Sequence, residues 1–228
     1  MPEPDVSATS VQAKNAPEIN EKECNMPEFA EREFDARERV FAQGPWRVVF
    51  RRHVDRWRHT IYCLRSEAAG GDDIGDEAVG EASLPLLESL EGSPEEPWPT
   101  SPPWQSVHIE SRDSGQVALL MGMAGGSHWS ASIESSLDGA LIFDIACRVS
   151  GEAGDLGSAY KTAPGIRFDP LKAQLVGASG TCAIEFDSPQ NGPSNLEPQG
   201  AEQFRIKVAT PQIRSPATIR WRYSLRPV

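Results

Sequence analysis

The stretch that decides the fold runs from Trp104 to Val149 and reads WQSVHIESRDSGQVALLMGMAGGSHWSASIESSLDGALIFDIACRV. Apolar and polar residues alternate in much of it, most clearly where Trp129, Ala131 and Ile133 are interleaved with two serines and a glutamate. In a β-strand, successive side chains point to opposite faces of the sheet. The alternation therefore predicts half-buried strands rather than helices.

Three short connections divide this stretch, and each ends in glycine: Asp113-Ser114-Gly115, Ala124-Gly125-Gly126 and Leu137-Asp138-Gly139. A three-residue hairpin loop places its last residue in the left-handed region, where glycine is least strained. Loops of this length predict a four-stranded antiparallel meander with one apolar face. Its inward rows would be Val107–Met121–Trp129–Cys147, Ile109–Leu119–Ala131–Ile145 and Val117–Ile133–Phe143.

Further alternating segments occur near residues 172–187, 203–209 and 217–226. Together with an apparent hairpin at residues 45–65, they would supply a second sheet to cover the apolar face of the meander. We therefore predict an all-β fold, an antiparallel β-sandwich domain over residues 104–228 against which the hairpin packs. A flattened β-barrel is the alternative.

The remaining segments have different compositions. Residues 1–26 are polar and without periodicity, so we expect a disordered N-terminus. Residues 27–44 suggest a short helix, because Pro27 suits a first turn and pairs such as Glu33 and Arg37 are four residues apart. Residues 66–103 are acidic and rich in proline and glycine, which predicts a linker.

Charge and cysteine content limit the classes of function. The formal net charge of -11 argues against general binding to nucleic acid or to anionic membranes. No apolar stretch reaches the roughly 18 residues that span a bilayer, so we expect no membrane partner. The four cysteines show no CxxC spacing, which favours reduced thiols in a cytoplasmic protein. We find no cofactor motif and expect no cofactor.

The hairpin at residues 45–65 is strongly basic. Matching its apolar faces requires Phe50 opposite His59, Val48 opposite Ile61 and Trp46 opposite Cys63. The same register brings four candidate residues for binding an anion or a partner to the other face: Arg47, Arg51, Arg58 and Tyr62.

Arg51 would lie directly opposite Arg58 on that face, and like charges in this position are destabilising. Three explanations stay open. The guanidinium groups could extend into water, an acidic partner within the chain could neutralise them, or a nucleic acid or other external anion could bind there. The acidic segment 66–101 follows the hairpin at once and has ten acidic and no basic residues, so we expect that it covers the basic face.

A serine hydrolase could be imagined from Ser127, His128 and Ser130 together with Asp144. The predicted register instead distributes His128, Ser130 and Asp144 over the solvent face, with Ser132 opposite Asp144. The chain also lacks the GxSxG nucleophile elbow. A polar outer surface explains these residues, and we expect no hydrolase activity from them.

The run Val117–Ser130 resembles segments of functionally uncharacterised bacterial hypothetical proteins, and the likeness covers residues 104–160. This resemblance implies no functional residue. We therefore expect a non-catalytic binding or protein-interaction module whose ligand is unknown. The alternatives are an enzyme with a site on the outer face of the 104–149 meander, and a binder of anionic polymers through the Arg/Trp hairpin.

Overall fold

The structure, a computed structural model, describes residues 37–64, 85–177, 180–186, 194–210 and 216–228. In these ranges the chain forms two antiparallel sheets and no helix, so no described helix is long and apolar enough to cross a membrane. The predicted disordered segment 1–26 lies outside the described residues. So does most of the acidic stretch between the hairpin and Pro85.

The seven-stranded sheet has the strand order β1-β2-β3-β4-β9-β14-β13. Its strands are β1 (Glu38–Gln43), β2 (Trp46–His53), β3 (Arg56–Cys63), β4 (Pro85–Ser89), β9 (Leu156–Thr162), β13 (Ser194–Pro198) and β14 (Gln203–Val208).

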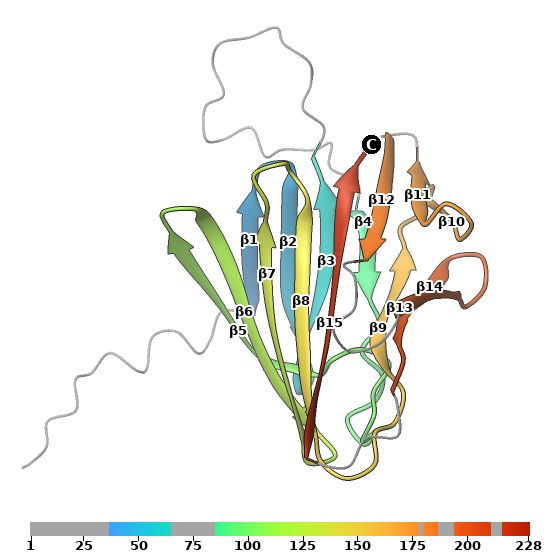
Figure 1. Cartoon of the computed structure of the whole chain (residues 1–228). Helices are drawn as coiled ribbons and strands as arrows, with labels where there is room; N and C mark the ends of the chain where they lie inside the picture. Colours follow the sequence, from blue (N-terminus) through green and yellow to red (C-terminus); the bar gives the residue numbers. More distant parts are fainter. Residues whose placement is uncertain (1–36, 65–84, 178–179, 187–193, 211–215) are drawn as a thin grey trace, which may run out of the picture. The chain divides into compact units, whose positions relative to one another are not determined.

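The eight-stranded sheet has the order β10-β11-β12-β15-β8-β7-β6-β5. Its strands are β5 (Trp104–Arg112), β6 (Gly115–Ala124), β7 (Ser127–Ser135), β8 (Leu141–Val149), β10 (Arg167–Asp169), β11 (Gln174–Gly177), β12 (Gly180–Phe186) and β15 (Ala217–Pro227). In Figure 1, β1 and β2 lie behind the meander strands β7 and β8, and β3 is seen between β8 and β15.

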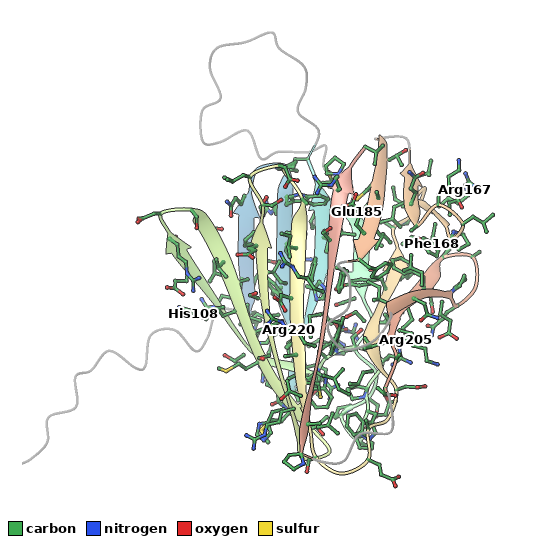
Figure 2. The ribbon with its side chains drawn as sticks, in the orientation of Figure 1. His108, Arg167, Phe168, Glu185, Arg205 and Arg220 are labelled. Carbon is green, nitrogen blue, oxygen red and sulfur yellow. The ribbon has the colours of Figure 1, made fainter. Side chains whose placement is uncertain are left out.

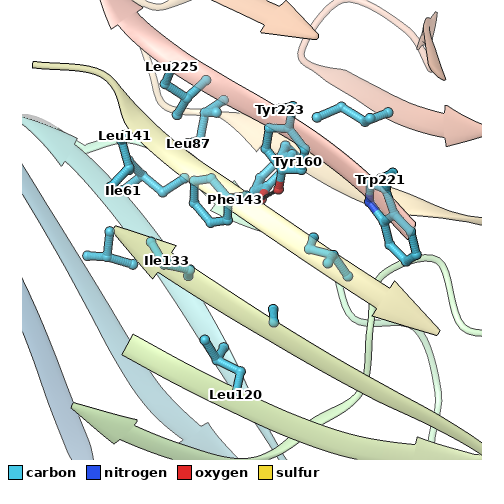
Figure 3. Close-up of a cluster of buried hydrophobic side chains, with 14 of the residues drawn as sticks. Ile61, Leu87, Leu120, Ile133, Leu141, Phe143, Tyr160, Trp221, Tyr223 and Leu225 are labelled. Atoms are coloured by element: carbon cyan, nitrogen blue, oxygen red, sulfur yellow. Dashed lines mark hydrogen bonds between the residues drawn. The ribbon is translucent and has the colours of Figure 1, made fainter. Parts of the chain in front are cut away.

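The facing surfaces of the two sheets form one apolar core, in a sandwich-like arrangement with no closed barrel among the described strands. The rings of Phe143 and Tyr223 stack within the eight-stranded sheet, with centroids 4.9 Å apart. Tyr160 of β9 meets Tyr223 edge to face across the core (Figure 3). Trp46 of β2 donates a hydrogen bond from Nε1 to the carbonyl of Gly139 at 2.7 Å, which joins the sheets at one end.

The predicted all-β fold and the four-stranded meander are confirmed, but two of the three predicted hairpin registers are wrong by one residue. Arg112 pairs with Gly115 and Ala124 with Ser127, so both connections are two-residue loops. Gly125 and Gly126 have φ of 53° and 78°, as the common two-residue loop with two left-handed residues requires. The third register is confirmed, because Trp129 pairs with Cys147.

The two shifts cancel, so they invert only β6. Val107 now pairs with Leu120, and Leu120 with Ala131, while β5 and β7 keep the predicted inward faces. Leu120 is 1% exposed, whereas Met121 is 61% exposed on the outer face. The predicted inward positions of Leu119 and Met121 are therefore wrong. A one-residue slip moves every side chain of a strand to the opposite face.

The predicted helix over residues 27–44 is not supported. Glu38–Gln43 form β1, which pairs along its whole length with β2, and residues 27–36 lie outside the described part of the chain. Phe41 faces the core and is fully buried there. A local helical pattern of ion pairs is worth only tenths of a kcal/mol, which burial against a sheet outweighs.

The predicted linker 66–103 also contains ordered structure. Pro85–Ser89 form β4, which lies between β3 and β9, and Leu86 and Leu87 are buried. The Trp98 ring meets that of Trp129 edge to face, with centroids 5.9 Å apart. This part of the acidic segment belongs to the core of the fold.

Two glutamines connect the edge strand β1 to the start of β6. The Gln116 side-chain oxygen accepts a hydrogen bond from the Ala42 backbone N–H at 2.9 Å. The Gln43 side-chain oxygen accepts one from the Gln116 backbone N–H at 3.0 Å, and its amide nitrogen donates to the Ser114 carbonyl. We call this reciprocal arrangement the glutamine clasp. It fastens an edge of one sheet to the other.

Candidate functional site

The inverted β6 creates a hollow on the outer face of the eight-stranded sheet. The hollow has a volume of about 500 Å³. It is lined by residues of β5, β6, β7, β8 and β15: Gln105, Ser106, Met121, Gly122, Met123, His128, Trp129, Ser130, Ala146, Arg148 and Thr218. Its two methionines lie on the outer face because β6 is inverted relative to the predicted register.

The strand register explains why the surface is hollow at this point. One outer row runs Met123–His128–Arg148–Thr218, and the next runs Ser106–Met121–Ser130–Ala146–Arg220. The second row has small side chains, Ser130 and Ala146, between the long side chains of Met121 and Arg220. Long side chains at the margins and short ones in the middle leave a depression in the sheet face.

Met121 and Met123 give the hollow an apolar margin that is open to solvent, with exposed fractions of 61% and 48%. Methionine is flexible and polarisable, and it is common on surfaces that bind apolar groups of varied shape. A pair of exposed methionines in a hollow marks a binding surface more specifically than a single exposed side chain does.

The serine, histidine and aspartate side chains that a serine hydrolase would need are separated from one another in this sheet. Ser127 is fully buried, and its Oγ accepts a hydrogen bond from the Ser150 backbone N–H at 3.0 Å. His128 and Asp144 lie two rows apart on the same face, roughly 13 Å at the usual rise per residue. Ser132 pairs directly with Asp144, as predicted.

Asp144 also has a cationic partner of its own. Arg220 donates from Nε to Asp144 Oδ1 at 2.6 Å and from Nη2 to Oδ2, a two-point contact. Figure 2 shows Arg220 on this sheet. A carboxylate engaged in this way does not orient the His128 ring. The described residues therefore contain no Ser-His-Asp hydrogen-bonded set at this position.

The basic hairpin has the predicted register in every pair. Phe50 pairs with His59 and Arg51 with Arg58, and Val54 and Asp55 form the loop between the two strands. The four candidate residues Arg47, Arg51, Arg58 and Tyr62 thus share the outer face of β2 and β3. They meet as two cross-strand pairs, because Arg47 pairs with Tyr62 in the same register.

Two carboxylates flank the opposed arginines. Arg51 Nε lies 2.8 Å from Glu38 Oε2, and Arg58 Nε lies 3.4 Å from Glu91 Oε2. The row therefore reads Glu38–Arg51–Arg58–Glu91, which offsets the repulsion between the two guanidinium groups. Of the three explanations considered for these arginines, this contact pattern favours acidic partners within the chain.

Glu91 belongs to the acidic segment 66–101, which we expected to cover the basic face of the hairpin. Its side chain is buried. Ser89 Oγ donates a hydrogen bond to Glu91 Oε1, and Arg56 Nη1 donates to the Glu91 carbonyl at 3.2 Å. Burial raises the pKa of the Glu91 carboxyl to about 7, although the Ser89 hydrogen bond and the charges of Arg58 and Arg56 oppose that rise.

Removing one flanking carboxylate tests whether the arginines can bind a polyanion. We expect Glu38→Gln to remove the carboxylate that pairs with Arg51 and to strengthen retention on heparin at low salt. The effect should be small, because an exposed ion pair is worth about 0–1 kcal/mol. The measurement is the salt concentration at which the protein elutes.

Glu110→Gln is the matched control, because Glu110 forms an exposed ion pair with Arg112 at 3.0 Å on the other sheet. If both variants elute at the salt concentration of the parent protein, the hairpin arginines do not form a polyanion site. If both shift equally, the gain reflects net charge alone.

Sequence reasoning missed the hollow bordered by Met121 and Met123, which we call the methionine hollow. Every residue from Val117 to Ala124 is apolar or glycine, so alternation carries no information about which face of this strand is inward. Only the loops decide, and the pair Gly125-Gly126 is the available signal for a two-residue turn. Reading that turn correctly would have placed Met121 and Met123 outside.

Comparisons of the chain with protein-family models, with curated proteins and with solved structures found no match.

Proposed function

We propose that this chain is a non-catalytic binding module and that it holds its partner in the hollow on the outer face of the eight-stranded sheet. The observation that carries the proposal is the exposed pair Met121 and Met123 at the margin of a depression of about 500 Å³. Burying apolar surface of this kind favours association by roughly 25 cal/mol per Å² before the costs of binding.

The described residues of the hollow support binding rather than covalent chemistry. Its hydroxyl groups come from Ser106, Ser130 and Thr218, and within the described residues none of them is hydrogen-bonded to a side chain that could act as a base. A nucleophile needs such a base, which in turn needs an orienting group. The enzyme alternative on this face therefore has less support than the binding module.

The methionine content of the chain allows a direct test by NMR. The chain has four methionines, Met1, Met26, Met121 and Met123, so protein with ¹³C-labelled methionine methyls gives few signals. We expect small apolar compounds such as indole to move the Met121 and Met123 signals together and saturably. The signals of Met1 and Met26 serve as internal references.

Assignment follows from Met121→Leu and Met123→Leu, each of which removes one signal while keeping an apolar side chain of similar volume. A diverse set of apolar compounds that leaves both signals unmoved at millimolar concentration would refute the proposal. Equal movement of all four signals would indicate non-specific association instead.

A further inference from the structure

The hollow is cationic, on a chain whose net charge is -11. None of its eleven lining residues carries a carboxylate, and its ionisable members are His128 and Arg148. Arg148 is exposed and has no ion-pair partner within the described ranges, whereas the neighbouring Arg220 is engaged by Asp144. The local charge is thus opposite to that of the chain as a whole.

The charges nearest to the hollow determine the electrostatic interaction with an occupant. At physiological ionic strength the screening length is about 8 Å, so distant acidic groups act weakly on an occupant of the hollow. An occupant in contact with Arg148 experiences mainly that guanidinium group. Charge complementarity therefore favours an anionic group at this end.

The apolar and cationic parts lie at a defined spacing. Met123, His128 and Arg148 are consecutive cross-strand neighbours on β6, β7 and β8. Neighbouring strands are about 4.8 Å apart, so the Met123 and Arg148 positions are separated by about 10 Å. Two adjacent residues of a peptide span this distance with their side chains, one apolar and one acidic.

The form of the hollow points to a polypeptide occupant. Its walls come from side chains on a single sheet face, so a small molecule would leave much of its surface in water, whereas small-molecule sites commonly bury 70–90% of the ligand. A partner protein covers that open side with its own body. A partner strand cannot pair with β6, β7 or β8, because each has a neighbour on both sides, so an occupant contacts these strands through side chains.

We infer that the hollow binds an acidic segment of a partner protein, which places an apolar side chain against Met121 and Met123 and a carboxylate on Arg148. This inference rests on the proposed function and adds the chemistry of the partner. His128 lies between the two contacts in the same row and can donate a hydrogen bond to the partner from its ring.

Four blocked peptides test the inference on the intact, methionine-labelled protein: Gly-Asp-Phe-Asp-Gly, its Asn-Phe-Asn and Lys-Phe-Lys counterparts, and Gly-Asp-Ala-Asp-Gly. We expect the first to move the Met121 and Met123 signals at the lowest concentration. The Kd of the amide peptide should be at least about threefold higher than that of the acidic peptide. The lysine and alanine peptides should bind more weakly still.

Arg148→Gln should abolish the preference for the acidic peptide over the amide peptide while the phenylalanine still moves the methionine signals. Arg112→Gln, which removes an exposed arginine at the end of β5, is the control and should keep the preference. Both variants change the net charge equally.

The outcomes separate the two proposals. Equal binding of the acidic and amide peptides would overturn the inferred partner chemistry but leave the binding module standing. If no peptide moves either signal, the inference fails, and the apolar compounds of the earlier test decide whether the binding module fails with it. An unchanged preference in Arg148→Gln would also overturn the inference.

Discussion

Replacing Leu120 by alanine should lower the free energy of unfolding by about 2–5 kcal/mol, the usual cost of truncating a buried leucine. Leu120 is 1% exposed and belongs to the core cluster between the sheets (Figure 3). The partly filled space that alanine leaves in a close-packed core adds to the loss of buried apolar area. Denaturant unfolding at an unchanged m-value measures the difference.

Leu119→Ala provides the matched control, because the two leucines are adjacent on the same strand. Leu119 is half-buried on the outer face, so its truncation should cost about 1 kcal/mol or less. The register with three-residue loops gives the opposite order, with Leu119 in the core. A larger cost for Leu119→Ala than for Leu120→Ala would therefore restore that register and remove the methionine hollow.

Stability should depend on pH through two buried groups that act in opposite directions. Burial lowers the pKa of His59 to about 3, so from pH 3 to 6.5 only the unfolded chain holds this proton and stability rises with pH. Burial raises the pKa of Glu91 to about 7. From about pH 4.5 to 7 only the folded chain holds that proton, and stability falls as pH rises.

The two contributions should cancel between about pH 4.5 and 6.5, since each changes stability by at most about 1.4 kcal/mol per pH unit. Glu91→Gln removes the falling contribution. Its stability relative to the parent protein should therefore increase by on the order of 3 kcal/mol between pH 4.5 and 7. Denaturant unfolding at several pH values measures this slope. Parallel profiles for the two proteins would show that Glu91 is ionised normally in the folded state.

The sequence predicted elements correctly where the two faces of a strand differ strongly. In the hairpin, Trp46, Val48 and Phe50 alternate with arginines and one valine, so only one register buries the apolar face, and that register is observed. The β7–β8 pairing was likewise predictable, because Trp129 and Ile133 alternate with polar residues. The predicted loop also ends at Gly139, whose φ of 80° is the left-handed conformation expected at that position.

Prediction failed where the local pattern was silent or weak. The continuous apolar run in β6 gives no face preference, so the hollow could be found only through turn chemistry. The acidic average of residues 66–103 predicted a linker and so missed the strand β4, because composition over a long window says little about a five-residue strand. The contact of Glu91 with Arg58 depends on where β4 pairs, which no local pattern specifies.

The glutamine clasp has a consequence for how this protein meets other copies of itself. An edge strand offers unpaired backbone groups to any extended chain, and sheets can grow through such edges into aggregates. The Gln116 side chain already occupies the Ala42 N–H on β1. At the far end of the other sheet the edge strand β10 has only three residues, too few for a long intermolecular ladder. The clasp at β1 and the short β10 therefore limit sheet growth at these two edges, while β5 and β13 form the other edges of the described sheets.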